Sequence, residues 1–265
     1  MNFVVCFVIF PVLSAMLLLV QIVKYCNERL NVYAITDAEK AYNGLQFQNS
    51  GKISKIAMAV DASLETIEKA AAIGANLLVV HHGLFWGKTV PITENTYKKY
   101  KLLIDHDIAV YSCHLPLDAH PEIGNNACLA KLLDLTSWAP AFEYHGEKIG
   151  VIGSRSIDRH RLKMFLETNF PHVVSMEFGP KRIEIIGIIS GGSGDLIIQA
   201  KNYGAGAVIV GECQQYHYNI VRENGINAYV CGHYMTETFG VDALGKEIAQ
   251  KFSIPFEFIH SNCPL

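Results

Sequence analysis

Two adjacent histidines, His81 and His82, followed by Gly83, end a short apolar run and are the first residues in the chain that could do chemistry. Imidazole is a common ligand of zinc, iron and nickel. Successive side chains of a strand point to opposite faces, so we expect the strand to end at Val80 and Gly83 to permit a turn in which both imidazoles converge. The alternative is one core histidine and one surface histidine, and the pair alone does not decide between them.

A second candidate pair is His233-x-x-x-Glu237. We expect it on the first turn of a helix, where residues four apart share one face. A carboxylate beside an imidazole can bridge two metal ions and supplies charge that a neutral histidine lacks. Taken alone, the motif is common by chance and equally describes a solvated ion pair.

The third candidate is Asp118, in the loop 115–124 that directly follows an expected strand. Parallel strands would bring this loop next to His81, and loops at strand ends are where functional residues collect. The alternatives are a turn or N-cap role for Asp118 and ordinary loop positions for His114 and His120.

Short β-branched runs alternate with helix-like stretches after residue 20, which is the pattern of an α/β protein. The expected strands are 53–60, 75–80, 108–113, 148–153, 182–189 and 207–210, and the segment 229–232 leads to His233. The expected helices are 64–73 with Ser63 as N-cap, 93–105, 125–133, 157–168, one reaching Tyr203 after Gly191-Gly192-Ser193-Gly194, and 236–251. This rhythm places a boundary near residue 126. We expect one α/β lobe from residues 20–125 plus 232–265, which would hold the candidate metal ligands, and a second α/β lobe from residues 126–231.

Composition narrows the class of protein. The chain has 22 basic and 25 acidic residues, and its one basic cluster is Lys98, Lys99 and Lys101, which argues against nucleic acid as a main partner. Seven scattered cysteines without a CxxC pair indicate reduced thiols in a cytosolic protein and argue against a zinc finger.

The segment from Phe3 to Val20 is apolar and carries no charge. Residues 1–19 are therefore treated as an N-terminal extension that could be a membrane segment, a signal peptide or a stretch upstream of the true start. The segment is just short of the roughly 20 residues that span a bilayer, and no basic residue precedes it as in a signal peptide. We favour translation from Met16, with Gln21 to Leu30 as the first helix of a cytoplasmic protein. Membrane anchoring or export through this segment is the alternative.

Several segments together carry a family resemblance: Asn43-Gly44-Leu45-Gln46, His81-His82-Gly83-Leu84-Phe85-Trp86, His114-Leu115-Pro116-Leu117-Asp118, Gly124-Asn125-Asn126 and His233-Tyr234-Met235-Thr236-Glu237-Thr238-Phe239-Gly240. From about residue 20 to its end the chain resembles the GTP cyclohydrolase I type 2 homologues, also called Nif-three-like proteins. The order and spacing of the segments make the resemblance specific. The apolar segment before Val20 lies outside the family pattern.

The resemblance implies two lobes of mixed sheet flanked by helices, with a dinuclear metal site between them. The matching ligands are His81, His82, Asp118, His233 and Glu237, and characterised relatives form ring-shaped homohexamers. Some relatives carry an inserted domain between the halves; the 115 positions from Asp118 to His233 indicate the short form.

The resemblance also implies hydrolysis, with GTP or another nucleotide or phosphoester as the small-molecule substrate. Two divalent ions about 3.5–4 Å apart, bridged by Glu237, would share a water made nucleophilic at neutral pH. Zinc, iron, manganese and nickel are not distinguished by such ligands. His114 and His120 are candidates for proton transfer, with surface loop positions as the simpler interpretation. A non-catalytic metal-binding regulatory or chaperone-like protein is the alternative function.

Two further motifs have simpler interpretations. Gly191-Gly192-Ser193-Gly194 loosely resembles an anion-binding turn at a helix N-terminus, but we favour a tight turn between strand and helix. Phe85 and Trp86 could stack on a purine base, although such aromatic residues more often belong to a core.

Overall fold

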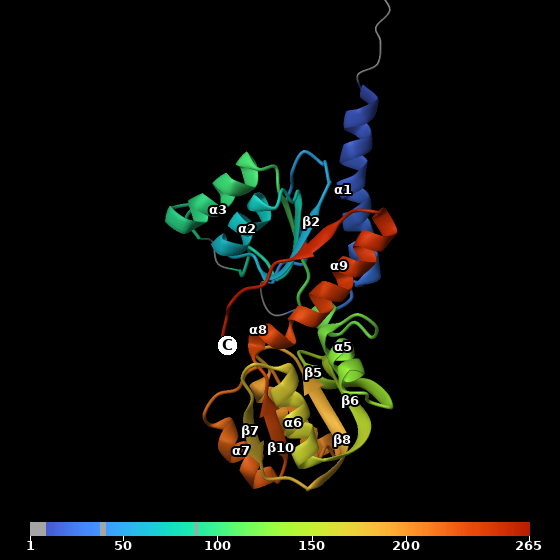
Figure 1. Cartoon of the computed structure of the whole chain (residues 1–265), viewed down its shortest axis with the longest axis vertical. Coiled ribbons are helices and arrows are strands. Elements are labelled where there is room, and N and C mark those ends of the chain that lie inside the picture. Colours follow the sequence, from blue (N-terminus) through green and yellow to red (C-terminus); the bar gives the residue numbers. More distant parts are fainter. Residues whose placement is uncertain (1–8, 38–40, 88–89) are drawn as a thin grey trace, which may run out of the picture. The chain divides into compact units, whose positions relative to one another are not determined.

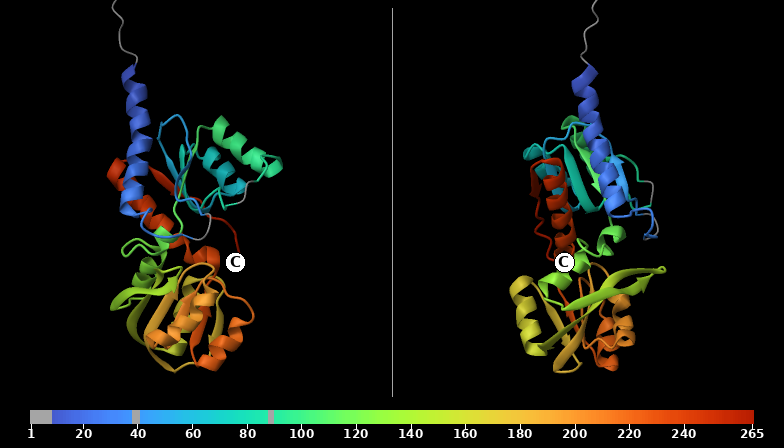
Figure 2. Two further views of the ribbon diagram at one scale, coloured as in Figure 1. Left: turned by 180° about the vertical axis from the view of Figure 1, so that it is seen from behind. Right: turned by 90° about the vertical axis from the view of Figure 1, so that its right-hand side faces the viewer.

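The computed structural model describes residues 9–37, 41–87 and 90–265, shown in Figure 1 and from two further sides in Figure 2. These residues divide into two compact units. Unit 1 contains residues 9–33, 41–87, 90–113 and 245–260, and unit 2 contains residues 34–37, 114–244 and 261–265. Each unit is a mixed sheet flanked by helices, as expected from the sequence.

Unit 1 is built on a five-stranded sheet of order β1-β4-β3-β2-β11, in which only the edge strand β1 is antiparallel to its neighbour. Its strands are β1 (Gly44–Phe47), β2 (Ile56–Asp61), β3 (Leu77–His82), β4 (Ala109–Ser112) and β11 (Phe256–Phe258). Its helices are α1 (Ile9–Arg29), α2 (Leu64–Ala72), α3 (Glu94–Asp105) and the C-terminal part of α9 (Thr238–Phe252).

Helices cover both faces of this sheet, which explains why its central strands are continuous apolar runs. On one face, Ile67 and Ala70 of α2 and Leu103 of α3 pack in a core cluster with residues of β2, β3 and β4. On the other face, Tyr111 of β4 donates a hydrogen bond of 2.9 Å to Asn27 of α1. The α2 helix begins where the sequence predicts, because the Ser63 hydroxyl accepts the backbone N–H of Thr66 at 3.0 Å.

Unit 2 is built on a six-stranded sheet of order β5-β6-β8-β9-β10-β7. The central strands β8, β9 and β10 are parallel, and the other pairings are antiparallel. The strands are β5 (Ser137–Tyr144), β6 (Glu147–Asp158), β7 (Val174–Glu177), β8 (Arg182–Ile189), β9 (Ala207–Val210) and β10 (Asn227–Val230). The helices are α4 (Leu115–Asp118), α5 (Asn125–Leu132), α6 (Arg159–Asn169), the 3₁₀ helix η1 (Gly194–Tyr203), α7 (His217–Asn224), α8 (His233–Thr236) and the first part of α9.

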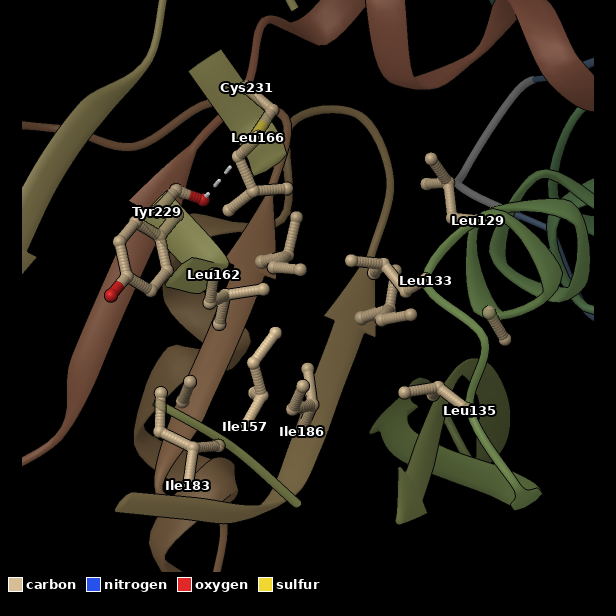
Figure 3. Close-up of a cluster of buried hydrophobic side chains, with 14 of the residues drawn as sticks. Leu129, Leu133, Leu135, Ile157, Leu162, Leu166, Ile183, Ile186, Tyr229 and Cys231 are labelled. Atoms are coloured by element: carbon tan, nitrogen blue, oxygen red, sulfur yellow. Dashed lines mark hydrogen bonds between the residues drawn. The ribbon is translucent and has the colours of Figure 1, made fainter. Parts of the chain in front are cut away.

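Alternate residues of the central strands of unit 2 point to opposite faces of the sheet and belong to two separate hydrophobic cores. Ile209 of β9 joins the cluster that contains α5 and α6, whereas Val208 joins the cluster that contains η1 and α7. Figure 3 shows the first cluster, in which Leu162 and Leu166 of α6 lie in one core with Ile183 and Ile186 of β8 and Tyr229 of β10. Both faces of this sheet are therefore buried, as expected for a parallel centre.

Differences from the expected elements have local causes. The strands 182–189 and 207–210 are confirmed residue for residue. The strand expected at 148–153 continues to Asp158, whose carboxylate caps α6 by accepting the N–H groups of His160 and Arg161. The edge strands β1, β5, β7 and β11 were not expected; β5 even contains Pro140, which an edge position tolerates.

Apart from the short segments 34–37 and 261–265, the chain passes from unit 1 to unit 2 at residues 113/114 and returns at 244/245. The sequence predicts lobe boundaries at 125/126 and 231/232. The segment 114–125 groups with unit 2 because the start of α5 is bonded to that unit's sheet. Asn126 donates to the carbonyl of Ile149 at 2.7 Å, and its own carbonyl oxygen accepts the N–H of Ser190 at 2.8 Å.

The apolar N-terminal segment lies partly outside the described residues, which begin at residue 9. The helix expected from Gln21 to Leu30 belongs to the longer α1, which ends at Arg29. Arg29 donates to both carboxylate oxygens of Glu247 in α9, at 2.9 Å each. Among the described residues, no helix combines the length and hydropathy needed to cross a bilayer.

Replacing Leu162 with alanine tests the α6 core of unit 2. Leu162 is fully buried, so Leu162→Ala leaves a cavity and should lower the free energy of unfolding by about 2–5 kcal/mol in chemical denaturation. Met164, on the same helix, is 54% exposed, and Met164→Ala should change it by less than about 0.5 kcal/mol. Equal effects of the two substitutions would contradict this packing.

Candidate metal centre

His81 and His82 converge without the backbone turn expected after Val80, because β3 continues through both residues. Their ring centroids lie 4.8 Å apart. Each ring is fixed by an oxygen from a neighbouring strand. The Nδ1 of the fully buried His81 donates to the carbonyl of Cys113 at 2.9 Å, and the Nδ1 of His82 lies 2.9 Å from Oδ1 of Asp61. The expectation that the strand ends at Val80 is therefore wrong. The two rings lie close together although both residues belong to β3, and each ring is held by its own hydrogen bond.

Gly83 is needed because the side chain of Gln46 fills the space that a Cβ atom would take. Its backbone conformation is not one that requires glycine. A Cβ atom at this position would lie 2.2 Å from Nε2 of Gln46. The Oε1 of Gln46 accepts the N–H of Leu84 at 2.6 Å, and its amide donates to the carbonyl of Tyr42. Gln46 therefore holds the segment directly after the two histidines.

Phe85 and Trp86 are not core residues in this structure, since they are 40% and 45% exposed. The indole N–H of Trp86 donates to the carbonyl of Gly83 at 3.0 Å. Its ring lies edge-on to His82, with 5.5 Å between the centroids. An exposed aromatic surface thus adjoins one of the candidate ligands.

Asp118 is a buried carboxylate at the end of α4 in unit 2. Its Oδ1 accepts hydrogen bonds from Nδ2 of Asn125 at 2.8 Å and from the hydroxyl of Ser190 at 2.9 Å. Asn125 is in turn fixed through its Oδ1, which accepts the N–H of Gly240 at 2.7 Å. Two donors on one oxygen hold the Asp118 carboxylate in one orientation.

The loop around Asp118 depends on two of the residues in its motif. A Cβ atom at Gly124 would lie 2.4 Å from the carbonyl oxygen of His120 and 2.8 Å from that of Asp118. Asn126 donates to the Asp118 carbonyl at 3.3 Å. The sequence provided Gly124-Asn125-Asn126 only as part of the family resemblance, and nothing in it indicated Ser190.

His233 and Glu237 form the expected pair, but Glu237 caps the short helix α8 and does not continue it. Nε2 of His233 lies 3.2 Å from Oε1 of Glu237, and its Nδ1 lies 2.8 Å from Oε2 of Glu212. Glu237 is only 2% exposed, and its carboxylate lies within 4.8 Å of that of Asp118. Glu237 thus stands close to both other candidate ligands of unit 2.

The glycine cluster is the expected tight turn, and it lies directly against these ligands. Gly191 has a φ of +67°, and a Cβ atom there would lie 2.2 Å from Oε1 of Glu237. A Cβ atom at Gly192 would lie 3.3 Å from Cε1 of His233. The N–H of Gly191 donates to the hydroxyl of Thr236 at 3.1 Å. Backbone rather than side chains therefore forms this wall of the site.

The pKa of His233 reflects opposing effects. Burial alone lowers this pKa, but hydrogen bonds and charge from Glu237 and then Glu212 outweigh burial and raise it to about 9. Both ring nitrogens face carboxylates, so the protein favours a cation at this position. A proton provides it in the metal-free protein.

The two candidates for proton transfer differ. Nδ1 of His114 lies 2.7 Å from Oδ1 of Asp37, whose Oδ2 accepts the N–H of Leu115 at 3.1 Å. The side chains of His114 and Asp37 are 16% and 6% exposed, so His114 is not a surface residue. Nδ1 of His120 accepts the N–H groups of Glu122 and Ile123, both at 3.2 Å, which is a loop-closing role.

One pattern is shared by all the histidines that are candidates for ligation or proton transfer except His120. In each, Nδ1 contacts a carbonyl or carboxylate oxygen, so the neutral ring carries its proton on Nδ1 and its lone pair on Nε2. Metal-ligating histidines characteristically donate their other N–H in this way. Within unit 2, the Nε2 of His233 and the buried carboxylates of Asp118 and Glu237 are donors of the kind that a divalent metal ion accepts.

Comparison with known proteins identifies the family. The sequence pattern of the Duf34/NIF3 (NGG1p interacting factor 3) family matches residues 18–264. The chain belongs to this family. A NIF3 relative from Pyrococcus horikoshii is 40% identical over 90% of this chain and 96% of its own length. Another, from Deinococcus radiodurans, is 37% identical over 91% and 92% respectively, and both are named GTP cyclohydrolase 1 type 2 homolog.

Solved structures agree with this NIF3 assignment. A protein described as ybgI, of unknown function, is 31% identical and superposes with a TM-score of 0.86 over 93% of this chain and 99% of its own. A protein from Thermus thermophilus is 30% identical, with a TM-score of 0.84 over 92% and 98%. The resemblance seen in the motifs is confirmed, and relatives of similar length support the short form.

Titration of the metal-free protein tests the environment of His233. Because the folded pKa of about 9 lies above the ordinary value of 6.5, this imidazole stabilises the fold fully below about pH 6.5. That contribution is lost as pH rises through about 9. NMR titration should show His233 protonated at neutral pH, and Glu237→Gln should lower its pKa. A His233 pKa near 6.5 in the parent protein would contradict this arrangement.

Proposed function

We propose that this NIF3-family protein is a metal-dependent hydrolase that binds two divalent ions through His81, His82, Asp118, His233 and Glu237. The observation that carries the proposal is the pair of buried carboxylates of Asp118 and Glu237, which lie within 4.8 Å of each other. Two like charges in a buried setting repel each other and lose hydration, and a divalent cation offsets both costs.

The chemistry of such a site is hydrolytic. Bound divalent ions would supply a water whose pKa is lowered to about 7, which is a nucleophile at neutral pH. Asn125 and Ser190 hold the Asp118 carboxylate in one orientation, so the ligand needs little rearrangement when a cation binds. Between the two candidates for proton transfer, the contacts favour His114, because the Asp37 carboxylate on its Nδ1 makes Nε2 more basic, whereas Nδ1 of His120 accepts two backbone N–H groups.

A nucleotide or another phosphoester is the proposed substrate class. The names of the relatives refer to GTP. The exposed indole of Trp86 beside His82 offers a surface on which a planar base could stack. Histidine and carboxylate ligands accept zinc, iron, manganese or nickel, so the metal is left open in this proposal.

Elemental analysis of the purified protein is the direct test. We expect about two divalent ions per chain, with a sharp fall in Glu237→Ala and in His81→Ala because each removes a ligand. His172→Ala, which changes an exposed histidine of unit 2, should leave the metal content unchanged. Metal content that is low in the parent, or indifferent to the ligand substitutions, would overturn the proposal.

Turnover separates the hydrolase from the alternative of a metal-binding regulatory or chaperone-like protein. The loaded protein should convert GTP or a phosphoester, and Glu237→Ala should abolish that conversion. Metal that binds at the expected ratio without any turnover would favour the alternative.

We also propose that the protein self-associates as a homohexamer in the cytoplasm. Unit 1 has a hollow of about 700 Å³ lined by apolar residues of α3 and the preceding segment, among them Phe85, Ile92, Tyr97 and Ile104. These side chains are 40–67% exposed in the single chain, and apolar surface of this kind favours contact with another copy. None of the six described cysteines forms a disulfide, which supports a reducing compartment.

A charge placed in this apolar surface tests self-association. Ile104 is 67% exposed, so Ile104→Lys should preserve the fold while burying a charge in the proposed interface. Light scattering during size-exclusion chromatography should show a smaller assembly for Ile104→Lys. Gln250→Lys, at an exposed position of α9, should retain the parental mass. A monomeric parent protein would disprove the hexamer.

A further inference from the structure

We infer that Glu212 is a positioning residue for the metal centre, which fixes the ring of His233 so that Nε2 is presented as the ligand atom. This inference rests on the metal site proposed above. Glu212 lies two residues after the end of β9, and it is not among the proposed ligands.

The contact between the two side chains sets the tautomer. Oε2 of Glu212 lies 2.8 Å from Nδ1 of His233. A carboxylate can only accept a hydrogen bond, so Nδ1 must carry the proton. Nε2 then faces the side of Glu237, 3.2 Å from its Oε1. The His233 ring is thus held between two acidic residues. Glu212 orients the ring, and Glu237 would bind the same metal ion as Nε2 of His233.

The backbone of Glu212 is fixed by the same glycine turn that lies against the ligands. Its N–H donates to the carbonyl of Gly191 at 2.9 Å. The preceding Gly211 packs so closely that a Cβ atom there would lie 2.6 Å from the Gly191 carbonyl oxygen and from the Thr236 hydroxyl. The carbonyl of Gly211 accepts the N–H of Gly232, one residue before His233, at 3.0 Å. Glu212 and His233 are therefore joined through backbone as well as side chains.

The far end of the Glu212 loop is tied down by a second histidine. Nδ1 of His217 accepts the N–H of Gln214 at 2.8 Å, and its Nε2 donates to Oδ1 of Asp195 at 3.0 Å. The His217 side chain is only 2% exposed, and the hydroxyl of Tyr216 donates to the same carboxylate oxygen. The segment 212–217 is thus attached to η1 at one end and to the glycine turn at the other. These contacts hold Glu212 in place beside His233.

A comparable arrangement exists in unit 1, where Asp61 contacts Nδ1 of His82 at 2.9 Å. In metal sites, a carboxylate on the second ring nitrogen orients the imidazole and makes the ligating nitrogen more basic. Loss of such a partner typically lowers metal affinity by about 10- to 100-fold. Because the Glu212 side chain is 47% exposed, its removal should not disturb the core of unit 2.

The experiment measures zinc affinity of the full chain by competition with a chromophoric chelator at neutral pH. Glu212→Ala should weaken zinc binding by about 10- to 100-fold, while the zinc content at saturation stays that of the parent. Glu212→Gln should weaken it less, because an amide oxygen still accepts the Nδ1 proton. Glu223→Ala, which removes an exposed carboxylate of α7 in the same unit, should bind like the parent.

NMR of the metal-free variants gives a readout that a merely structural role would not move. The pKa of His233 should fall in Glu212→Ala and in Glu212→Gln, since both remove the charge beside Nδ1, with no change in Glu223→Ala. Parental zinc affinity in Glu212→Ala, with zinc bound normally by the parent, would overturn the positioning role alone. Failure of the parent itself to bind zinc or any other divalent ion would overturn the metal site and this inference together.

Discussion

Two carboxylates, Asp118 and Glu237, buried within 4.8 Å of each other, impose the constraint on which much of unit 2 depends. Burying a charge is costly unless hydrogen bonds or an opposite charge offset it. Asn125 and Ser190 supply the hydrogen bonds for Asp118, and the imidazole of His233 supplies the opposite charge beside Glu237. Folding of this unit therefore fixes the orientation of acidic groups that a metal ion would later use.

Unit 1 meets a different requirement, because its two candidate ligands are adjacent in one strand. The pleat of β3 would send His81 and His82 to opposite faces. In the structure the rings contact Cys113, directly after β4, and Asp61 of β2, and their centroids lie 4.8 Å apart. Parallel pairing of β2, β3 and β4 is what places both oxygens at the same end of the sheet.

The alternation of apolar and polar segments along the chain was enough to predict the buried strands. Residues whose role depends on a partner far away in the sequence were missed. Apolar residues identify the strands β8 and β9 to the residue, because β9 and the second half of β8 are buried and have no charged positions. The five candidate ligands were recognisable from residue type, spacing and family resemblance together. Ser190 and Glu212 were not, because a serine or glutamate after a strand has no distinctive pattern, and its role depends on a partner 72 positions away for Ser190 and 21 for Glu212. Edge strands were missed for another reason: in β5, for example, buried and exposed residues do not alternate regularly.

The wall of glycine backbone at residues 191–192 makes the site vulnerable at positions that do no chemistry. A single methyl group on residue 191 would occupy the space of the Glu237 carboxylate, since the two would be 2.2 Å apart. Relatives could therefore lose the geometry of this centre while keeping every ligand. A relative with any side chain at the position of Gly191 would keep the ligand pattern without this wall.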